Sequence, residues 1–267
     1  MTATVQIDRR RESTLWLKLV IVGGLVFLTA NTITAQAQSS SPENEAAARR
    51  IVDSALAAMG GRETLSRVRS LSMLGMTRLQ VEGQQVQGAA RYVVLRPDRY
   101  RADVTIDNKK IIQAFNGKTG WGMEGLKTYP PEIDKRIEMA MQTALYRGLL
   151  ALFSASSPHL QVRLVGRLDV NDQKADAVDW DDGAGNMTRF YFDIKSHLPL
   201  RAVYSDIDSQ GNPVVTTDDF FGFRKVDGLV WPYRMIEYQG DEKKREDIFT
   251  EIQVNGKVAE SYFDPIP

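Results

Sequence analysis

The chain has 267 residues, of which 43% are hydrophobic and 25% are charged, a composition typical of a globular protein. Its 34 Lys and Arg residues balance 34 Asp and Glu residues, and the lack of a basic excess argues against a nucleic-acid-binding protein. It contains no cysteine, so neither a disulfide nor lipidation at an N-terminal cysteine can occur in it.

Residues 1–37 have the order of features that defines a secretory signal peptide. A basic start is followed by the apolar run 19–30 and by Ala35-Gln36-Ala37, whose small residues fit a cleavage site. We expect cleavage after this triplet, which leaves 38–267 as one exported domain. The alternative is an uncleaved membrane anchor, because the apolar stretch counted from 15 to 33 approaches the ~20 residues of a spanning helix.

The exported part begins with helical sequence. Alanine is abundant in Glu45–Met59 and apolar residues recur there at helical spacing, so we expect a helix that ends at Gly60-Gly61. A short helical turn follows at 63–68. From Ser70 the pattern changes to alternation, which predicts strands joined by short turns at 71–81, 85–95, 100–106 and 110–115.

The middle of the chain contains the strongest helical signal. A tight turn at 116–120 leads into Trp121-Gly122-Met123, and Pro130-Pro131 then begins an apolar helix at about Glu132–Phe153. The apolar stripe of this helix must be buried against the sheet, as a fixed plug or as a movable lid. Further strands separated by turn residues follow at 161–168, 175–181, 188–194, 200–206, 214–221, 229–238 and 246–254.

These elements predict a mainly β (α+β) fold. We expect a highly curved antiparallel sheet, or unclosed β-barrel, of about 11 strands, with an N-terminal helix and a mid-chain lid or plug helix. This sheet is wider than a small self-filling barrel, so we expect a cavity on its concave side.

Alternation places aromatic and Met side chains on the concave side. Two interpretations stay open: these side chains are plain core packed by the helices, or they line an apolar pocket. The candidate pocket residues are Tyr92, Val94, Tyr100, Val104, Ile106, Trp121, Ile137, Met141, Leu145, Phe190, Phe192, Trp231, Tyr233 and Met235.

Arg96 is the polar residue of most interest. It follows Tyr92 and Val94 onto the concave side, directly before Pro97 ends the strand. A buried arginine needs acceptors, which here are either carbonyls of a helix end or loop, or an acidic group of a ligand. The alternative is an arginine at the rim, in contact with water.

The sequence carries few signs of catalysis. Its two histidines, His159 and His197, lie in expected loops near prolines, and no metal-ligand cluster, P-loop or nucleophile elbow is present. Adjacent acids such as Asp218-Asp219 point to opposite faces of a strand, so neither acid of such a pair partners the other. We therefore expect no enzyme, no metal and no cofactor. A hydrolase would gain support only if Asp219, Glu237 and His159 met in one pocket.

Several short motifs, taken together, resemble a known family. Arg96-Pro97 is followed by a strand and then by Asn116-Gly117-Lys118-Thr119-Gly120-Trp121, and later stretches are Phe190–Arg201, Val226–Tyr233 and Val254–Pro265. These motifs are similar to those of the LolA/LolB-like outer-membrane lipoprotein-sorting family, in which an Arg-Pro pair precedes a strand and a D-G-K-T-x-W turn. The match spans most of the exported part in order, with Asn116 where Asp is common.

The resemblance implies an unclosed antiparallel β-barrel whose helical lid covers an apolar cavity for acyl chains. It also implies that Arg96 is a latch that bonds the lid backbone. The functional hypothesis is a monomeric periplasmic carrier that shields the acyl chains of a lipoprotein or another lipidic ligand, with an inner-membrane donor complex and an outer-membrane acceptor as partners and no nucleic acid. The alternative is an envelope-stress sensor or scaffold that binds a protein partner through the same sheet.

Overall fold

The computed structural model describes residues 41–81, 83–208 and 210–266, so the predicted signal peptide lies outside the described residues. The helical elements are α2 (Pro42–Ala58), α3 (Arg62–Arg67), α4 (Pro131–Tyr146) and the 3-10 helices η1 (Gly148–Ser154) and η2 (Glu260–Phe263). The strands are β1 (Ser70–Val81), β2 (Gln84–Leu95), β3 (Arg99–Ile106), β4 (Lys109–Phe115), β5 (Gly120–Glu124), β6 (Lys127–Thr128), β7 (Gln161–Val170), β8 (Gln173–Asp181), β9 (Met187–Asp193), β10 (Pro199–Ile207), β11 (Pro213–Val226), β12 (Leu229–Gln239) and β13 (Glu242–Val254).

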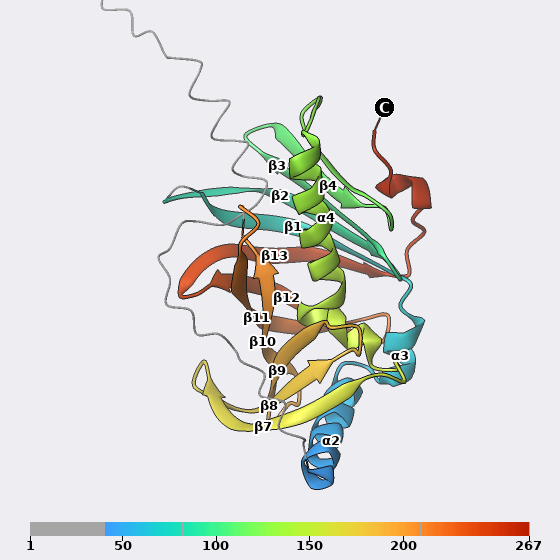
Figure 1. The fold of residues 1–267 in the computed structure, drawn as a ribbon, viewed down its shortest axis with the longest axis vertical. Coiled ribbons are helices and arrows are strands. Elements are labelled where there is room, and N and C mark those ends of the chain that lie inside the picture. The colour runs from blue at the N-terminus through green and yellow to red at the C-terminus, as the bar shows by residue number, and fades with distance from the viewer. Residues whose placement is uncertain (1–40, 82, 209, 267) are drawn as a thin grey trace, which may run out of the picture.

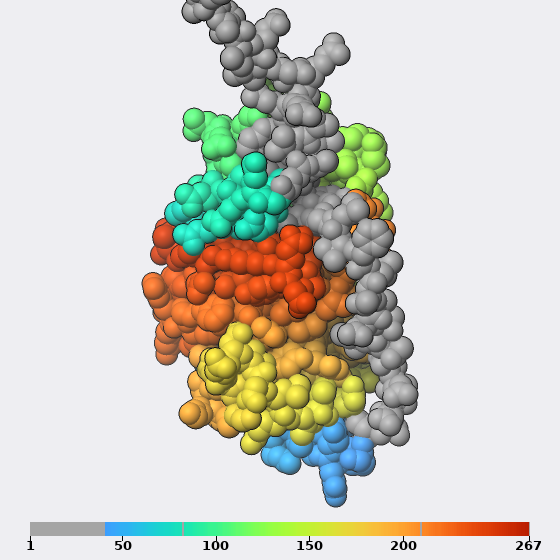
Figure 2. All heavy atoms as spheres, turned by 90° about the vertical axis from the view of Figure 1, so that its left-hand side faces the viewer, coloured from blue at the N-terminus to red at the C-terminus, as the bar shows by residue number. Residues whose placement is uncertain are grey.

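These strands form one 13-stranded antiparallel sheet in the order β6-β5-β4-β3-β2-β1-β13-β12-β11-β10-β9-β8-β7. Strands that are consecutive in the chain are neighbours in the sheet, except β6 and β7, and the pairing of β1 with β13 joins the two halves at the centre. The described residues of the edge strands β6 and β7 do not pair with each other, so the sheet is an unclosed barrel and the predicted fold class is confirmed. From the side, the atoms of β1 and β2 lie above those of β13, with β7, β8 and α2 at the lower end (Figure 2).

The topology decides where the mid-chain helix lies. Because β6 and β7 are at opposite edges, the chain between them must cross the concave side of the sheet. α4 has 16 residues, which is about 24 Å of helix. It contacts β5, β4 and β3 near one edge and β10 on the other half of the sheet, so it bridges the two halves of the curved sheet (Figure 1).

The single helix predicted at Glu132–Phe153 is interrupted, so its last seven residues, 147–153, were predicted wrongly. α4 ends before Arg147, which has extended backbone, and Gly148 begins η1 with a φ of 57°. A Cβ atom at position 148 would lie 3.1 Å from Asp218 Oδ2 and 3.1 Å from the ring of Tyr204. The backbone direction and the tight packing both favour glycine at this break.

The predicted strand number was slightly too low, because the edge strands β5 and β6 are short. The turn before β5 forms as expected: the side-chain oxygen of Asn116 accepts hydrogen bonds from the backbone N–H groups of Lys118 and Thr119, at 3.1 and 3.0 Å. After Glu124 the chain turns back at once into the two-residue strand β6. A strand this short leaves little periodicity in the sequence.

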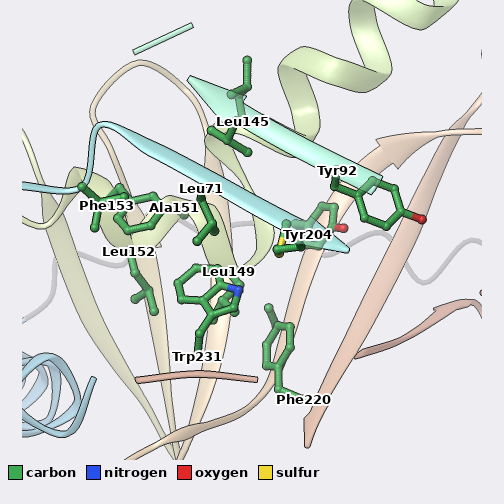
Figure 3. Packing of buried hydrophobic residues seen from close by; sticks show 14 of the residues in the cluster. Leu71, Tyr92, Leu145, Leu149, Ala151, Leu152, Phe153, Tyr204, Phe220 and Trp231 are labelled. Carbon is green, nitrogen blue, oxygen red and sulfur yellow. The ribbon is translucent and has the colours of Figure 1, made fainter. Parts of the chain in front are cut away.

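Most buried apolar side chains form one core between the concave side of the sheet and the helices. Trp231 of β12 stacks on Phe153 of η1, with ring centroids 5.5 Å apart, and Phe190 stacks on Phe192 at 5.4 Å. Figure 3 shows the η1 residues Leu149, Ala151, Leu152 and Phe153 close to Leu71 and Trp231. Among the described residues, no helix has the length and apolar character needed to cross a bilayer.

Candidate functional site

The inner face, defined as the face of the sheet that α4 and η1 cover, carries the candidate pocket residues. All of them except Trp121 belong to the large core or pack against it. Tyr100, Val104, Tyr233 and Met235 are only partly buried, so the inner face still reaches solvent at these positions. Contact of these residues with a ligand stays a prediction.

Trp121 lies on the opposite, outer face, and the inner position expected for it was wrong. It clusters with Ile112, Ala114 and Met123, and its Nε1 donates a hydrogen bond of 2.7 Å to the carbonyl of Phe263. The pairing of β5 with β4 turns Trp121 outward and leaves the glycines on either side of it facing inward.

These two glycines form the surface on which α4 rests. A Cβ atom at Gly120 would lie 2.4 Å from the backbone nitrogen of Glu138, and one at Gly122 would lie 2.6 Å from Ile137 Cδ1. The N–H groups of Gly122 and Gly120 donate to Asp134 Oδ1 at 3.0 Å and to Glu138 Oε2 at 3.3 Å. α4 therefore covers the edge of the sheet and satisfies backbone donors that β6 is too short to pair.

The charge of these two carboxyl groups responds to their surroundings. Burial raises the pKa of Asp134, opposed by its hydrogen bond from Gly122. A hydrogen bond from Lys135 lowers the pKa of Glu138, which makes its carboxylate a stable acceptor at neutral pH. The N-terminal half of α4 is thus attached to β5 by two charge-assisted hydrogen bonds.

The inner face is mostly filled by the protein's own side chains. A hollow of about 40 Å³ remains between Leu79, Ala102, Val104, Ile111 and Gln113. A second hollow of about 140 Å³ lies between α2 and the β8–β9 region, lined by Arg50, Ile51, Ser54, Asp176, Phe192, Asp193 and His197. Typical small-molecule pockets hold about 300–1,000 Å³, so neither hollow accepts an acyl chain without movement.

Arg96 joins two helical segments at one end of the inner face. Its Nη1 donates to the carbonyls of Val68 at 3.1 Å and Leu65 at 3.4 Å, at the end of α3, and its Nη2 donates to the carbonyl of Phe153 at 3.1 Å. Its guanidinium also lies 5.1 Å from the centroid of the Phe153 ring. Of the acceptors expected for this arginine, the structure supplies the carbonyls of a helix end and of η1.

The other end of the inner face carries charged side chains that the sequence did not indicate. The register places Asp218 of β11 opposite Glu237 of β12, and Glu237 opposite Arg245 of β13. Arg245 pairs with Glu237 at 2.6 Å and with Asp247 at 3.1 Å. Hydroxyl groups complete the network: Tyr204 donates to Asp218 at 2.9 Å, and Tyr92 donates to Asp247 at 2.9 Å.

Two carboxyl groups at this end of the inner face have pKa values above their usual range. Burial raises the pKa of Asp218 to about 8, and the negative charge of Glu237 adds to the effect. Burial also raises the pKa of Asp206, two residues beyond Tyr204 on β10, to about 6. The inner face therefore combines an apolar region with a polar end where carboxyl groups outnumber the guanidinium that pairs with them.

The trio that would have supported a hydrolase is not assembled. Asp219 points to the outer face, where Arg201 pairs with it at 2.5 Å, whereas Glu237 points inward. His159 lies in the loop beside Gly183. In the part of the chain that the structure describes, no group of three or more His, Cys, Asp or Glu side chains is placed to hold a metal ion.

Comparison with known proteins finds solved structures that resemble this chain in fold. No family model and no curated protein matches the sequence. Among solved structures, a DUF1329 family protein from Desulfovibrio piger matches 81% of this chain and 97% of its own, with 10% identity and a TM-score of 0.50. A LolA superfamily protein from Nitrosomonas europaea matches 82% of this chain and 97% of its own, with 11% identity and a TM-score of 0.47.

An outer membrane lipoprotein-sorting protein domain from Vibrio parahaemolyticus matches 80% of this chain and 97% of its own, with 11% identity and a TM-score of 0.45. The structures matched thus include proteins named for the family that the sequence motifs resemble. The DUF1329 family protein, at a TM-score of 0.50, shares the fold of this chain. Identities this low show the shared fold and nothing beyond it.

Proposed function

We propose that the protein is a carrier that binds the acyl chains of a lipoprotein, or another lipidic ligand, non-covalently between α4 and the inner face of its sheet. The observation that carries the proposal is the position of α4. This helix spans the concave side from one half of the sheet to the other and covers apolar side chains that a ligand would otherwise contact.

Entry of a ligand requires α4 to move, because side chains of the core fill the inner face and the hollow between β1, β3 and β4 is only about 40 Å³. The helix buries Ile137, Met141 and Leu145, whose exposure costs about 1.5–3 kcal/mol each, or roughly 5–9 kcal/mol together. Each acyl CH₂ removed from water contributes about 0.8 kcal/mol, so a 16-carbon chain contributes roughly 12 kcal/mol before ordering costs. A bound acyl chain can therefore offset the displacement of α4.

Two features suit this movement. The backbone changes direction at Arg147 and Gly148, which makes this pair the hinge between α4 and η1. Arg96 holds the far end of η1 to the end of α3 through backbone carbonyls. In the proposed cycle α4 swings away about this hinge. Arg96 acts as the latch of the lid segment by holding η1, to which α4 is joined, against the end of α3.

The setting of the carrier is part of the same proposal. Residues 1–37 act as a cleaved signal peptide, and the remaining domain works in the periplasm as a monomer. The ligand passes from an inner-membrane donor to an outer-membrane acceptor. No covalent step is involved, so the protein needs neither catalytic residues nor a cofactor.

The direct test is to look for the ligand. Protein purified from its native host should carry a lipid that mass spectrometry identifies, and the delipidated protein should take up an apolar fluorophore. Absence of both the lipid and the uptake would refute the carrier function.

A reversible lock tests the role of α4. Because the chain has no cysteine, Gly122→Cys with Ile137→Cys introduces a single thiol pair. A Cβ atom at 122 lies 2.6 Å from Ile137 Cδ1, so the two new side chains meet. We expect the oxidised protein to lose most of its fluorophore uptake and the reduced protein to regain it, with the two single variants as controls. Equal uptake in both redox states would exclude α4 as the lid.

A further inference from the structure

The polar end of the inner face carries more acidic than basic side chains. The charges of Asp206, Asp218 and Glu237 affect one another there, and Asp247 lies with Glu237 at the guanidinium of Arg245. Arg245 pairs with Glu237 and Asp247. Among residues 41–81, 83–208 and 210–266, no ion pair joins Asp218 to a cation, and the hydrogen bond it accepts is the one from Tyr204.

The neighbouring elements do not correct this imbalance. Arg147, which follows α4, faces Asp206 and uses its Nη1 to donate to the carbonyl of Ser205. Asp206 itself accepts a hydrogen bond from the N–H of Ile207 at 2.8 Å. Asp218 is 5% exposed and lies directly across from a second carboxylate. A buried anion in this position is unstable unless a proton or an external cation joins it.

An unsatisfied hydroxyl marks the same place. Thr216 is 0% exposed, and its Oγ1 has no hydrogen-bond partner in the described part of the chain. It precedes Asp218 by two residues on β11, so both side chains project to the inner face. The register also places Thr216 opposite Tyr204, whose hydroxyl already donates to Asp218. The cluster thus offers a buried hydroxyl oxygen, beside the carboxylates, that can still accept a hydrogen bond.

We propose that Asp218, Glu237 and Thr216 form a subsite for the cationic group of an amphipathic ligand, a primary ammonium with an alkyl tail. The inference rests on the carrier function proposed above and names the class of its ligand. An ammonium group has three donors, which suit the carboxylate of Glu237, the hydroxyl oxygen of Thr216 and the carboxyl group of Asp218, which releases its proton when the cation binds. Its charge supplies the positive partner that Asp218 lacks.

The alkyl tail has an adjoining apolar surface. Leu79 of β1 lies opposite Arg245, two strands from Glu237 and therefore about 10 Å away along the sheet. Leu79 also lines the 40 Å³ hollow with Val104 of β3 and Ile111 of β4, two strands that α4 contacts. A ligand with its cation at Asp218 would extend its tail toward this hollow and displace α4 there.

The test compares three probes of equal chain length, all below their micelle-forming concentrations: dodecylammonium, dodecanol and dodecanoate. Calorimetry on the full exported domain should show dodecylammonium bound about tenfold or more tightly than dodecanol, the discrimination that a partly desolvated ion pair supplies. Asp218→Asn should remove this preference and leave dodecanol binding unchanged. Asp219→Asn, which removes the same charge from the outer face, is the matched control and should retain the preference.

Each outcome bears on the inference. Equal binding of the three probes, tightest binding of dodecanoate, or a preference that survives Asp218→Asn would overturn the cationic subsite while leaving the carrier function in place. Failure of all three probes to bind would remove both. Glu237→Gln provides a second variant and should also weaken dodecylammonium selectively.

Discussion

Replacing Asp218 with asparagine should make the protein more stable at alkaline pH. The substitution keeps the shape of the side chain and an acceptor for the Tyr204 hydroxyl, which donates to Asp218 at 2.9 Å. It removes a carboxyl group whose pKa burial raises to about 8, with Glu237 adding to the effect. In the unfolded chain the same carboxyl has a pKa of about 3.9.

The sign of the effect follows from these two values. Between pH 4 and pH 8 the folded protein retains the proton of Asp218 while the unfolded chain releases it. The free energy of unfolding therefore falls as pH rises through this window, by up to about 1.4 kcal/mol per pH unit, and is level above it. Over the whole window the loss is on the order of 5 kcal/mol, and asparagine has no such loss.

Urea denaturation of both proteins, followed by tryptophan fluorescence from pH 4.5 to pH 9, measures the difference directly. All other titrating groups are common to the two proteins, so the difference between their unfolding free energies reports position 218. Asp219→Asn is the control and should destabilise the protein at neutral pH, because Asp219 pairs with Arg201 at 2.5 Å. A difference between Asp218→Asn and the parent that stays constant from pH 5 to pH 8 would refute the reasoning.

Three further substitutions have definite expected results. Arg96→Met leaves three backbone carbonyls without their donor and should destabilise the protein by about 2–4 kcal/mol, with faster amide exchange around Phe153 as the local readout. Gly122→Val places atoms within 2.6 Å of Ile137 Cδ1, so it should loosen α4 and increase fluorophore uptake without loss of strand signal in circular dichroism. Hydrogen bonds from a lysine and an arginine lower the pKa of Glu246 to about 2, so its stabilising contribution is lost as pH falls from about 4 to 2; Glu246→Gln should cost roughly 2 kcal/mol at pH 7 and flatten that part of the pH profile.

Strand alternation predicted most of the sheet because one face is buried and the other is wet. Tyr92, Tyr100 and Met235 were assigned to the concave side from this period alone, and the core includes or contacts all three. Trp121 was misplaced because the period alone does not say which of two alternating sets faces inward. In β5 the residues that face inward are Gly120 and Gly122. They have no side chains because α4 packs directly against them, and the sequence alone does not show that a helix lies there.

The acidic cluster could not be found from alternation for a different reason. The sequence of β11 contains four doubled residues in succession, Val214-Val215, Thr216-Thr217, Asp218-Asp219 and Phe220-Phe221. A shift of one residue gives both faces the same residue types, so the pattern does not decide which aspartate points inward. Pairing with β10 and β12 decides it, and this pairing depends on contacts far apart in sequence.

The break between α4 and η1 also depends on tertiary contacts. Gly148 fits the apolar stripe of the predicted helix, and glycine within a helix costs only about 1 kcal/mol relative to alanine. In the fold Gly148 has a φ of 57°, and Asp218 and Tyr204 lie 3.1 Å from the position that a Cβ atom would occupy, so the backbone and the packing each favour glycine there. From the sequence, Gly148 was compatible with a continuous helix, and the break became evident only from the contacts in the fold.

The hydrophobic effect explains why side chains fill the inner face, and the same effect would favour a lipid there. Apolar side chains on a concave sheet contribute stability only when something excludes water from them, and α4 is placed to do so. In the proposed carrier a lipid and α4 compete for one surface, so the affinity for the lipid is the free energy of burying the lipid minus that of burying α4. Variants that weaken α4 packing, such as Gly122→Val, should tighten lipid binding, whereas variants that weaken the inner face of the sheet should reduce lipid binding and α4 packing together.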